Sequence, residues 1–217
     1  MQTMSSLAIS DAVLAFACLF AVFLMAQQKS FADVHRFSAT AALLGFLLMA
    51  LASITGSLRY GISSAWSGPH EMLMNAAMFL APPLTGIATC LGVSVSSWSR
   101  AAWGRLILGV CVVYEVCRWY GLDIIYRDLQ MAVLLIFASF MLLRSSVESG
   151  PKWLIIASVT SYFTGALIIG TEGTLAGYLR LDLFRYLIGL GNLLLSSGLY
   201  LLFKNRYQND NDKQLSA

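Results

Sequence analysis

The stretch SLAISDAVLAFACLFAVFLMAQ, residues 6–27, decides the class of fold. It carries one charged side chain, Asp11, within an apolar run. An α-helix needs about 20 mainly apolar residues to cross the hydrocarbon core of a bilayer, and this run is long enough. No Lys or Arg precedes Lys29, so the basic segment that begins a secretory signal peptide is missing. We therefore interpret residues 6–27 as a retained first membrane-spanning helix.

The composition of the whole chain agrees with this interpretation. Of its 217 residues, 58% are hydrophobic and 12% are charged, and the mean hydropathy is +0.72. Soluble domains carry about 25% charged residues, so the composition is typical of an integral membrane protein. The net charge of +3 is too small to indicate nucleic acid as a partner.

Further apolar segments repeat the pattern of the first. Six more are long enough to span a membrane: residues 38–60, 71–95, 103–122, 128–144, 153–173 and 184–203. The connectors between them are short and polar. The sequence therefore predicts an all-α protein, a polytopic seven-transmembrane-helix bundle over residues 1–203, followed by a polar, frayed cytoplasmic tail over residues 204–217.

The distribution of basic residues predicts the orientation of this bundle. Nine lie at one membrane side: Lys29, Arg36, Arg100, Arg105, Arg144, Lys152, Lys204, Arg206 and Lys213. Five lie at the other: Arg59, Arg118, Arg127, Arg180 and Arg185. Cytoplasmic loops carry the excess of Lys and Arg, so we expect the N-terminus outside and the C-terminus in the cytoplasm. Short loops and the lack of a targeting segment favour a bacterial inner membrane.

Charged residues inside the predicted spans point to a possible site. In CVVYEVCRWYG, residues 111–121, Glu115 and Arg118 lie one helical turn apart. Ionisable groups within a membrane are costly and are functional candidates by default. The sequence leaves open whether Glu115 pairs with Arg118 on its own helix or with Arg185 across the bundle.

Other polar side chains fall in the same outer third of the predicted bundle or on a helical stripe that begins there. On the last segment, Arg185, Gly189, Asn192 and Ser196 recur at helical spacing. We expect an outward-facing polar crevice, with these candidate ligand-binding residues: Asp11, Arg59, His70, Glu71, Asn75, Glu115, Arg118, Glu172, Asp182, Arg185 and Asn192. Alternatively, small residues four apart only let membrane helices pack closely, and the charges only fix helix register.

Several kinds of cofactor site do not fit the residues. Every lysine lies at or beyond a predicted helix end, which excludes a retinal Schiff base. His35 and His70 are the two histidines, too few for a three-histidine zinc site and predicted on opposite sides of the membrane. We expect no cofactor and no metal. His35 is interpreted as a solvated loop residue, and His70 as a helix-start residue or an acid–base group.

Two segments carry a family resemblance, SITGSLRYG at 53–61 and LDLFRYLIGLGN at 181–192. With seven predicted helices and an outside N-terminus, the chain resembles the seven-helix membrane hydrolase superfamily of alkaline ceramidases and progestin/adiponectin-type receptors. The resemblance implies a zinc hydrolase site built from serine, aspartate and histidines. Ser57 and Asp182 keep polar groups there, but Arg59 and Arg185 stand where histidines are expected, so the zinc ligands are missing.

The favoured function is binding or sensing of a small amphiphile or lipid headgroup, possibly as a subunit of a membrane complex. Arg59, Arg118 and Arg185 would pair with an anionic headgroup, because guanidinium groups suit carboxylate and phosphate. Glu115 and Asp182 would hold these arginines when the crevice is empty. Membrane lipids and a membrane-protein partner are the expected partners.

Other functions stay open. A metal-independent membrane enzyme acting on lipid-like substrates would use Glu115 or Glu172 as a general base, with an arginine stabilising the oxyanion. A purely structural role would leave the charges as locks between helices, and gated transport is a further possibility. Binding is favoured over catalysis, since no motif of a known catalytic site is present.

Overall fold

The protein is all-α apart from one short hairpin. A computed structural model describes residues 2–94, 96, 98–144 and 147–215. Its elements in chain order are α1 (Gln2–Met25), η1 (Gln28–Ser30), η2 (Asp33–His35), α2 (Arg36–Gly61), η3 (Ser64–Trp66), α3 (Ser67–Ser94), α4 (Arg100–Trp119), α5 (Asp123–Arg144), α6 (Ser149–Phe163), η4 (Thr164–Ile169), β1 (Thr174–Leu175), β2 (Tyr178–Leu179) and α7 (Arg180–Leu215). The all-α class predicted from the sequence is confirmed.

Within the described residues, five helical stretches are long and apolar enough to cross a membrane. They are Met4–Met25, Asp33–Gly61, Ser64–Ser94, Ser149–Ile169 and Arg180–Tyr207, which correspond to α1, α2, α3, α6 and α7. The α4 helix falls outside this set, and α5 contributes a shorter apolar stretch, Asp128–Leu143. That the two helices also cross the membrane stays a prediction.

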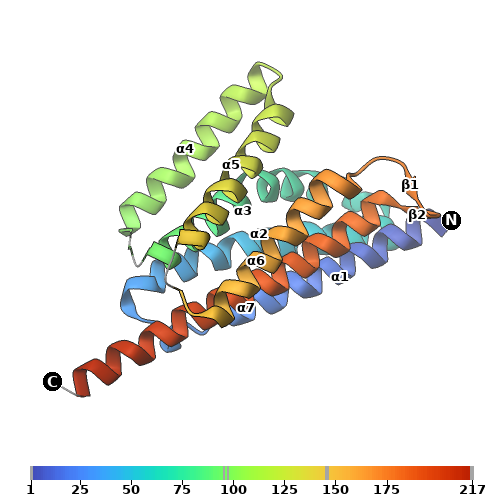
Figure 1. Ribbon diagram of the computed structural model, residues 1–217. Helices are drawn as coiled ribbons and strands as arrows, with labels where there is room; N and C mark the ends of the chain where they lie inside the picture. The colour runs from blue at the N-terminus through green and yellow to red at the C-terminus, as the bar shows by residue number, and fades with distance from the viewer. Residues whose placement is uncertain (1, 95, 97, 145–146, 216–217) are drawn as a thin grey trace.

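The helices α4 and α5 differ from the others in their packing. The five apolar helices lie along one another, whereas α4 diverges from the bundle and α5 lies between it and the rest (Figure 1). Trp103 is the buried residue of α4. The α4 helix is therefore a mostly exposed element, and its two ends border the grooves described below.

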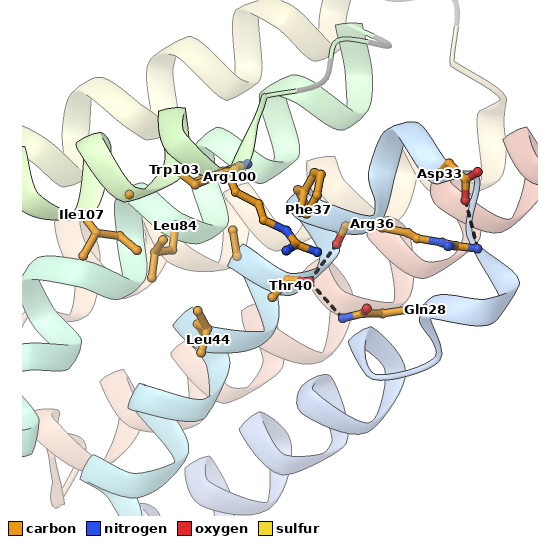
Figure 2. Close-up of a pocket in the computed structure, with 12 residues that line it drawn as sticks. Gln28, Asp33, Arg36, Phe37, Thr40, Leu44, Leu84, Arg100, Trp103 and Ile107 are labelled. Carbon is orange, nitrogen blue, oxygen red and sulfur yellow. Dashed lines mark hydrogen bonds and ion pairs between the residues drawn. The ribbon is translucent and has the colours of Figure 1, made fainter.

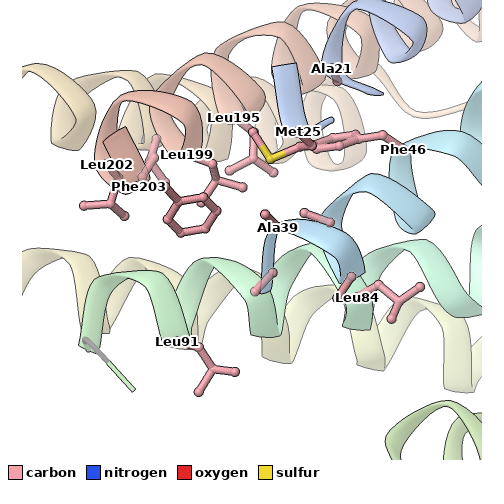
Figure 3. Packing of buried hydrophobic residues seen from close by; sticks show 14 of the residues in the cluster. Ala21, Met25, Ala39, Phe46, Leu84, Leu91, Leu195, Leu199, Leu202 and Phe203 are labelled. Carbon is pink, nitrogen blue, oxygen red and sulfur yellow. The ribbon is translucent and has the colours of Figure 1, made fainter. Parts of the chain in front are cut away.

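The main hydrophobic core lies where α1, α2, α3 and α7 meet (Figure 3). Phe46 of α2 and Phe203 of α7 are fully buried there. Glycines let the helices approach: a Cβ on Gly92 of α3 would lie 2.7 Å from Phe203 Cε1, and one on Gly45 would lie 2.9 Å from Thr85 Cγ2. Small residues give close helix packing in membranes, so part of the glycine pattern serves packing.

His35 is not the solvated loop residue that the sequence suggested. Its side chain is fully buried and stacks on Phe203, with ring centroids 4.9 Å apart. Phe31 meets the same ring edge-on at 5.5 Å. The connector between α1 and α2 folds back onto the end of the core, because η1 and η2 turn its aromatic side chains inward.

The last part of the chain also differs from expectation. A π-helical turn, η4, ends α6, and the strands β1 and β2 pair as an antiparallel hairpin before α7. Gly173, Ala176 and Gly177 adopt positive φ in this hairpin, a conformation that glycine adopts without strain. The α7 helix continues to Leu215, so residues 204–215, expected as a frayed tail, extend the helix.

The outside of the bundle is strongly apolar. On α1, Phe16 is 72% exposed and Phe23 is 63% exposed. Such side chains recur around the molecule, for example Ile9, Val13, Leu19, Phe20, Leu44 and Leu51. Monomeric soluble proteins seldom expose contiguous apolar patches of this extent, so the surface is compatible with a lipid environment.

Candidate functional site

The predicted site residues do not gather in one crevice. Most of them fall into three separate places: a buried cluster between α1 and α7, a groove between α3 and α4, and a polar group between α1, α6 and α7. Each place is built from residues at helical spacing, and each has a different exposure to the surroundings.

The buried cluster consists of Ser6, Ser10, Asp11, Asp182 and Arg185, and we call it the ion-pair cluster. Arg185 Nε lies 3.0 Å from Asp11 Oδ1, and the two side chains are 7% and 0% exposed. Ser10 donates a hydrogen bond of 2.6 Å to Asp182 Oδ1, and Ser6 donates one to Asp182 Oδ2. Residues 6 and 10 share a face of α1, and 182 and 185 share a face of α7. The cluster therefore joins the first helix to the last.

Two buried acceptors in the ion-pair cluster accept no hydrogen bond in the described structure, and both belong to Asp11. Oδ1 forms the ion pair with Arg185, and the other oxygen is Oδ2. It faces Gly56 of α2, where an added Cβ would collide with it and would lie 2.9 Å from both Asp11 Cγ and His70 Cε1. Arg185 is the cation of the cluster: it pairs directly with Asp11 and is linked to Asp182 through Ser10, to which its Nη1 donates at 3.2 Å. Asp11 thus relies on the ion pair, whereas Asp182 relies on hydrogen bonds from serine hydroxyls.

His70 and Tyr60 border the same region. His70 is 4% exposed, and its Nδ1 lies 3.0 Å from the carbonyl oxygen of Ala52. This contact makes Nδ1 the protonated nitrogen, because a carbonyl only accepts. The ring of Tyr60 meets His70 edge-on at 6.0 Å and lies 5.5 Å from Arg185 Cζ. His70 is therefore a buried residue that ties α3 to α2.

Arg59 and Glu71 lie at the rim of this region. Arg59 Nη1 is 3.5 Å from Glu71 Oε1, and the side chains are 30% and 65% exposed. Arg59 Cζ also lies 5.4 Å from the centroid of the Tyr60 ring. Exposed ion pairs of this kind contribute little to stability, so this pair adds little to holding α2 against α3.

Asn75, Glu115 and Arg118 line a groove between α3 and α4 of about 400 Å³. Glu115 and Arg118 form an exposed ion pair on α4, with Arg118 Nε donating to Glu115 Oε2 at 3.0 Å. Glu115 therefore pairs within its own helix and does not reach Arg185. Below these groups, Phe79 and Tyr114 face each other with ring centroids 3.6 Å apart. The groove has a polar rim and an apolar floor.

Asn192 is the predicted site residue in the third place, the polar group between α1, α6 and α7. It is 1% exposed, accepts a hydrogen bond of 2.7 Å from Tyr162 Oη and donates one of 3.2 Å to Cys18 Sγ. Ser158 and Ser161 of α6 donate to backbone carbonyl oxygens of α7, each at 2.8 Å. These polar contacts hold α6, α7 and α1 together within the bundle.

Glu172 is exposed in the connection between η4 and β1, apart from the other candidates. Several partners were not selected from the sequence: Ser6, Ser10, Tyr60 and Tyr162. Ser6 and Ser10 had a usable signal, because they lie four residues apart on the segment that carries Asp11. Tyr60 and Tyr162 had none, since an aromatic side chain in an apolar segment is commonly a packing residue.

No protein-family model, curated protein or solved structure matches this chain. Within the part of the chain that the structure describes, no group of three or more His, Cys, Asp or Glu side chains is arranged to hold a metal ion. The geometry of the three places is thus the basis for any functional assignment.

Proposed function

We propose that this chain is an integral membrane protein that binds or senses a small anionic amphiphile in the groove between α3 and α4. The observation that carries the proposal is the composition of that groove. Asn75, Glu115 and Arg118 form its rim, and Phe79 and Leu80 belong to its apolar lining. An amphiphile offers the same two kinds of surface, a charged head and an apolar tail.

Arg118 is the group that would recognise the head. Its guanidinium can form two parallel hydrogen bonds with a carboxylate or phosphate. Glu115 is its partner in the ion pair on α4, and this ion pair keeps the guanidinium on the lining of the groove. Both side chains are more than half exposed, so an anionic head can compete for Arg118 without uncovering a buried charge.

The ion-pair cluster supports a different role for Asp11, Asp182 and Arg185. These side chains are enclosed and hold one another, so they lack the access that a headgroup needs. We propose that they fix α7 against α1. The proposal thus confines ligand binding to Asn75, Glu115 and Arg118 among the residues selected from the sequence.

Binding of a fluorescent fatty acid tests the proposal. The probe is dansyl undecanoic acid, titrated into the full chain purified in a neutral detergent. Loss of a hydrogen bond to a charged group costs about 1.5–3 kcal/mol, which corresponds to a tenfold or larger increase in Kd. We expect this increase for Arg118→Gln, and a smaller Kd than that of the native chain for Glu115→Gln, which frees Arg118.

The control variant is Arg105→Gln, which removes an exposed cation elsewhere on α4. Its affinity for the probe should equal that of the native chain. Equal affinity of Arg118→Gln and the native chain would refute the proposal. Turnover of an added lipid, detected by mass spectrometry of the extract, would instead favour a membrane enzyme acting on lipid-like substrates.

A further inference from the structure

A second and larger groove lies at the opposite end of the bundle, between α2 and α4. Its volume is about 800 Å³. The beginnings of α2 and α4 form its walls, and Leu84 of α3 lies at its base (Figure 2). None of the residues selected from the sequence as a site lies in it. The groove exists because α4 diverges from the bundle and leaves this side of α2 uncovered (Figure 1).

One end of the groove is cationic. Arg100 of α4 projects across it toward α2 (Figure 2), with Cζ 5.2 Å from the centroid of the Phe37 ring. The described structure contains no ion pair between Arg100 and a carboxylate. Arg36 lies beside it and pairs with the exposed Asp33 at 2.9 Å. Arg100 is thus a cation held in place by an aromatic ring, with its hydrogen-bond donors available to a ligand.

A buried donor near Arg100 also lacks an acceptor. The indole Nε1 of Trp103 has no hydrogen-bond partner in the described structure, although the residue is 6% exposed and lines the groove. Buried donors are nearly always paired in folded proteins. The indole nitrogen is itself enclosed, so Arg100 is the polar group that a ligand entering this end of the groove meets.

The remainder of the groove is apolar. Leu44 of α2 and Ile107 of α4 lie on either side of Leu84 (Figure 2). Leu44 is 41% exposed, so this part of the groove is open at the side of the bundle. The groove therefore changes from cationic at the helix ends to apolar towards the middle of the helices, which is the order of groups met on entering a lipid leaflet.

Charge around the groove favours an anionic partner. The cationic end lies at the bundle end that holds the larger group of Lys and Arg residues, including Lys29, Arg36 and Lys204. By the distribution of charge this end is the predicted cytoplasmic one, and the cytoplasmic leaflet carries anionic lipids that attract basic segments. A guanidinium binds a phosphate with paired hydrogen bonds.

We propose that the groove between α2 and α4 binds one anionic phospholipid. Arg100 holds the phosphate, and an acyl chain lies along Leu44, Leu84 and Ile107. This inference goes beyond the amphiphile proposed for the groove between α3 and α4, because it uses another groove, other residues and a bilayer lipid. The bound lipid would fill the space that α4 leaves against α2.

Binding of fluorescent phospholipids to the purified full chain in neutral detergent tests this inference. The probes are NBD-labelled phosphatidylglycerol and NBD-labelled phosphatidylcholine. Both lipids carry the phosphate, but the choline of phosphatidylcholine brings a further cation beside Arg100, whereas phosphatidylglycerol has a net negative charge. We therefore expect phosphatidylglycerol to bind about tenfold more tightly, a difference of about 1.4 kcal/mol. Arg100→Gln should remove this preference and leave the weaker binding of phosphatidylcholine.

Three further variants complete the test. Gly104→Leu adds a side chain where the structure has open space on the lining of the groove, so it should weaken binding of both lipids without changing charge. Arg105→Gln and Arg118→Gln should bind phosphatidylglycerol like the native chain. Loss of phosphatidylglycerol binding in Arg118→Gln, with none in Arg100→Gln, would overturn the inference and leave the proposed function standing.

Three other results would also overturn it. Equal affinity for the two lipids would show that Arg100 does not distinguish an anionic headgroup from a zwitterionic one. Displacement of phosphatidylglycerol by millimolar inorganic phosphate would show a site for free phosphate. A change of oligomeric state in Gly104→Leu, measured by light scattering with lipid binding unchanged, would show that a second copy of the chain covers the groove.

Discussion

Arg185 of α7 lies against Asp11 of α1, with Nε 3.0 Å from Oδ1 and both side chains buried. Asp11 belongs to the first helix and Arg185 to the last, so the pair joins the two helices that are farthest apart in the sequence. Asp182 completes the cluster through Ser6 and Ser10. The cluster therefore contains two carboxylates and one guanidinium in a region shielded from water.

We predict that Arg185→Gln is strongly destabilising. Removing one partner of a buried ion pair costs about 3–5 kcal/mol, and here it leaves two carboxylates with no cation. Asp11→Asn should cost less, because it leaves Arg185 with Asp182 nearby. Thermal unfolding of the purified chain in detergent, followed by circular dichroism, measures the order. Glu115→Gln, which removes an exposed carboxylate, is the control and should leave the midpoint unchanged.

The double variant Asp11→Asn with Arg185→Gln sharpens this prediction. The two residues are in contact, so their effects should not add, and the double variant should be more stable than the sum of the single changes predicts. Additive effects would mean that the two side chains do not interact in the folded protein.

Gly56→Ala should also destabilise the bundle. Its Cβ would lie 2.9 Å from Asp11 Cγ and from His70 Cε1, and both neighbours are buried, so neither can move freely. Overpacking of this kind costs about 1–3 kcal/mol. Gly109→Ala on α4 is the matched control, because nothing lies within 4 Å of its added Cβ. An unfolding midpoint for Gly56→Ala equal to that of Gly109→Ala would contradict the close approach of α1, α2 and α3.

Tyr162→Phe should have a smaller effect. It removes the 2.7 Å hydrogen bond from Tyr162 Oη to Asn192 Oδ1, worth about 0.5–1.5 kcal/mol, and leaves the ring packed. Asn192→Ala should cost more, because it leaves the tyrosine hydroxyl unpaired as well. Denaturant titration in detergent measures both. Tyr120→Phe, at an exposed ring, should match the native chain; a Tyr162→Phe variant as stable as this control would contradict the contact.

The topology gives a separate prediction. In a chain whose native cysteines are replaced, Ser63→Cys and Tyr120→Cys should react with a membrane-impermeant thiol reagent added outside intact cells, and Ser99→Cys should not. This pattern follows if α3 and α4 both cross the membrane with the more basic end in the cytoplasm. The reverse pattern would refute the orientation, and labelling of Ser63→Cys without Tyr120→Cys would refute a spanning α4.

Sequence and tertiary structure contributed unequally to the candidate sites. Helical spacing placed Glu115 and Arg118 on one face of α4 but left two partners open for Glu115, and the structure shows that it pairs with Arg118. The same spacing placed Arg185, Gly189, Asn192 and Ser196 on one face of α7, and all four are buried. Helical spacing did not predict which residue of another helix each of them contacts. Arg185 contacts Asp11, and Asn192 contacts Tyr162.

The sequence by itself determined the all-α class and the helices of the bundle, because long apolar runs and the bonding needs of the backbone act along the chain. Only the tertiary structure decided which charges are buried and which are exposed. Glu115 and Asp11 look alike in the sequence, each a carboxylate within an apolar run. Asp11 lies between packed helices, whereas Glu115 lies on α4, which diverges from the bundle, so packing between distant segments gives one carboxylate a structural role and leaves the other open to a ligand.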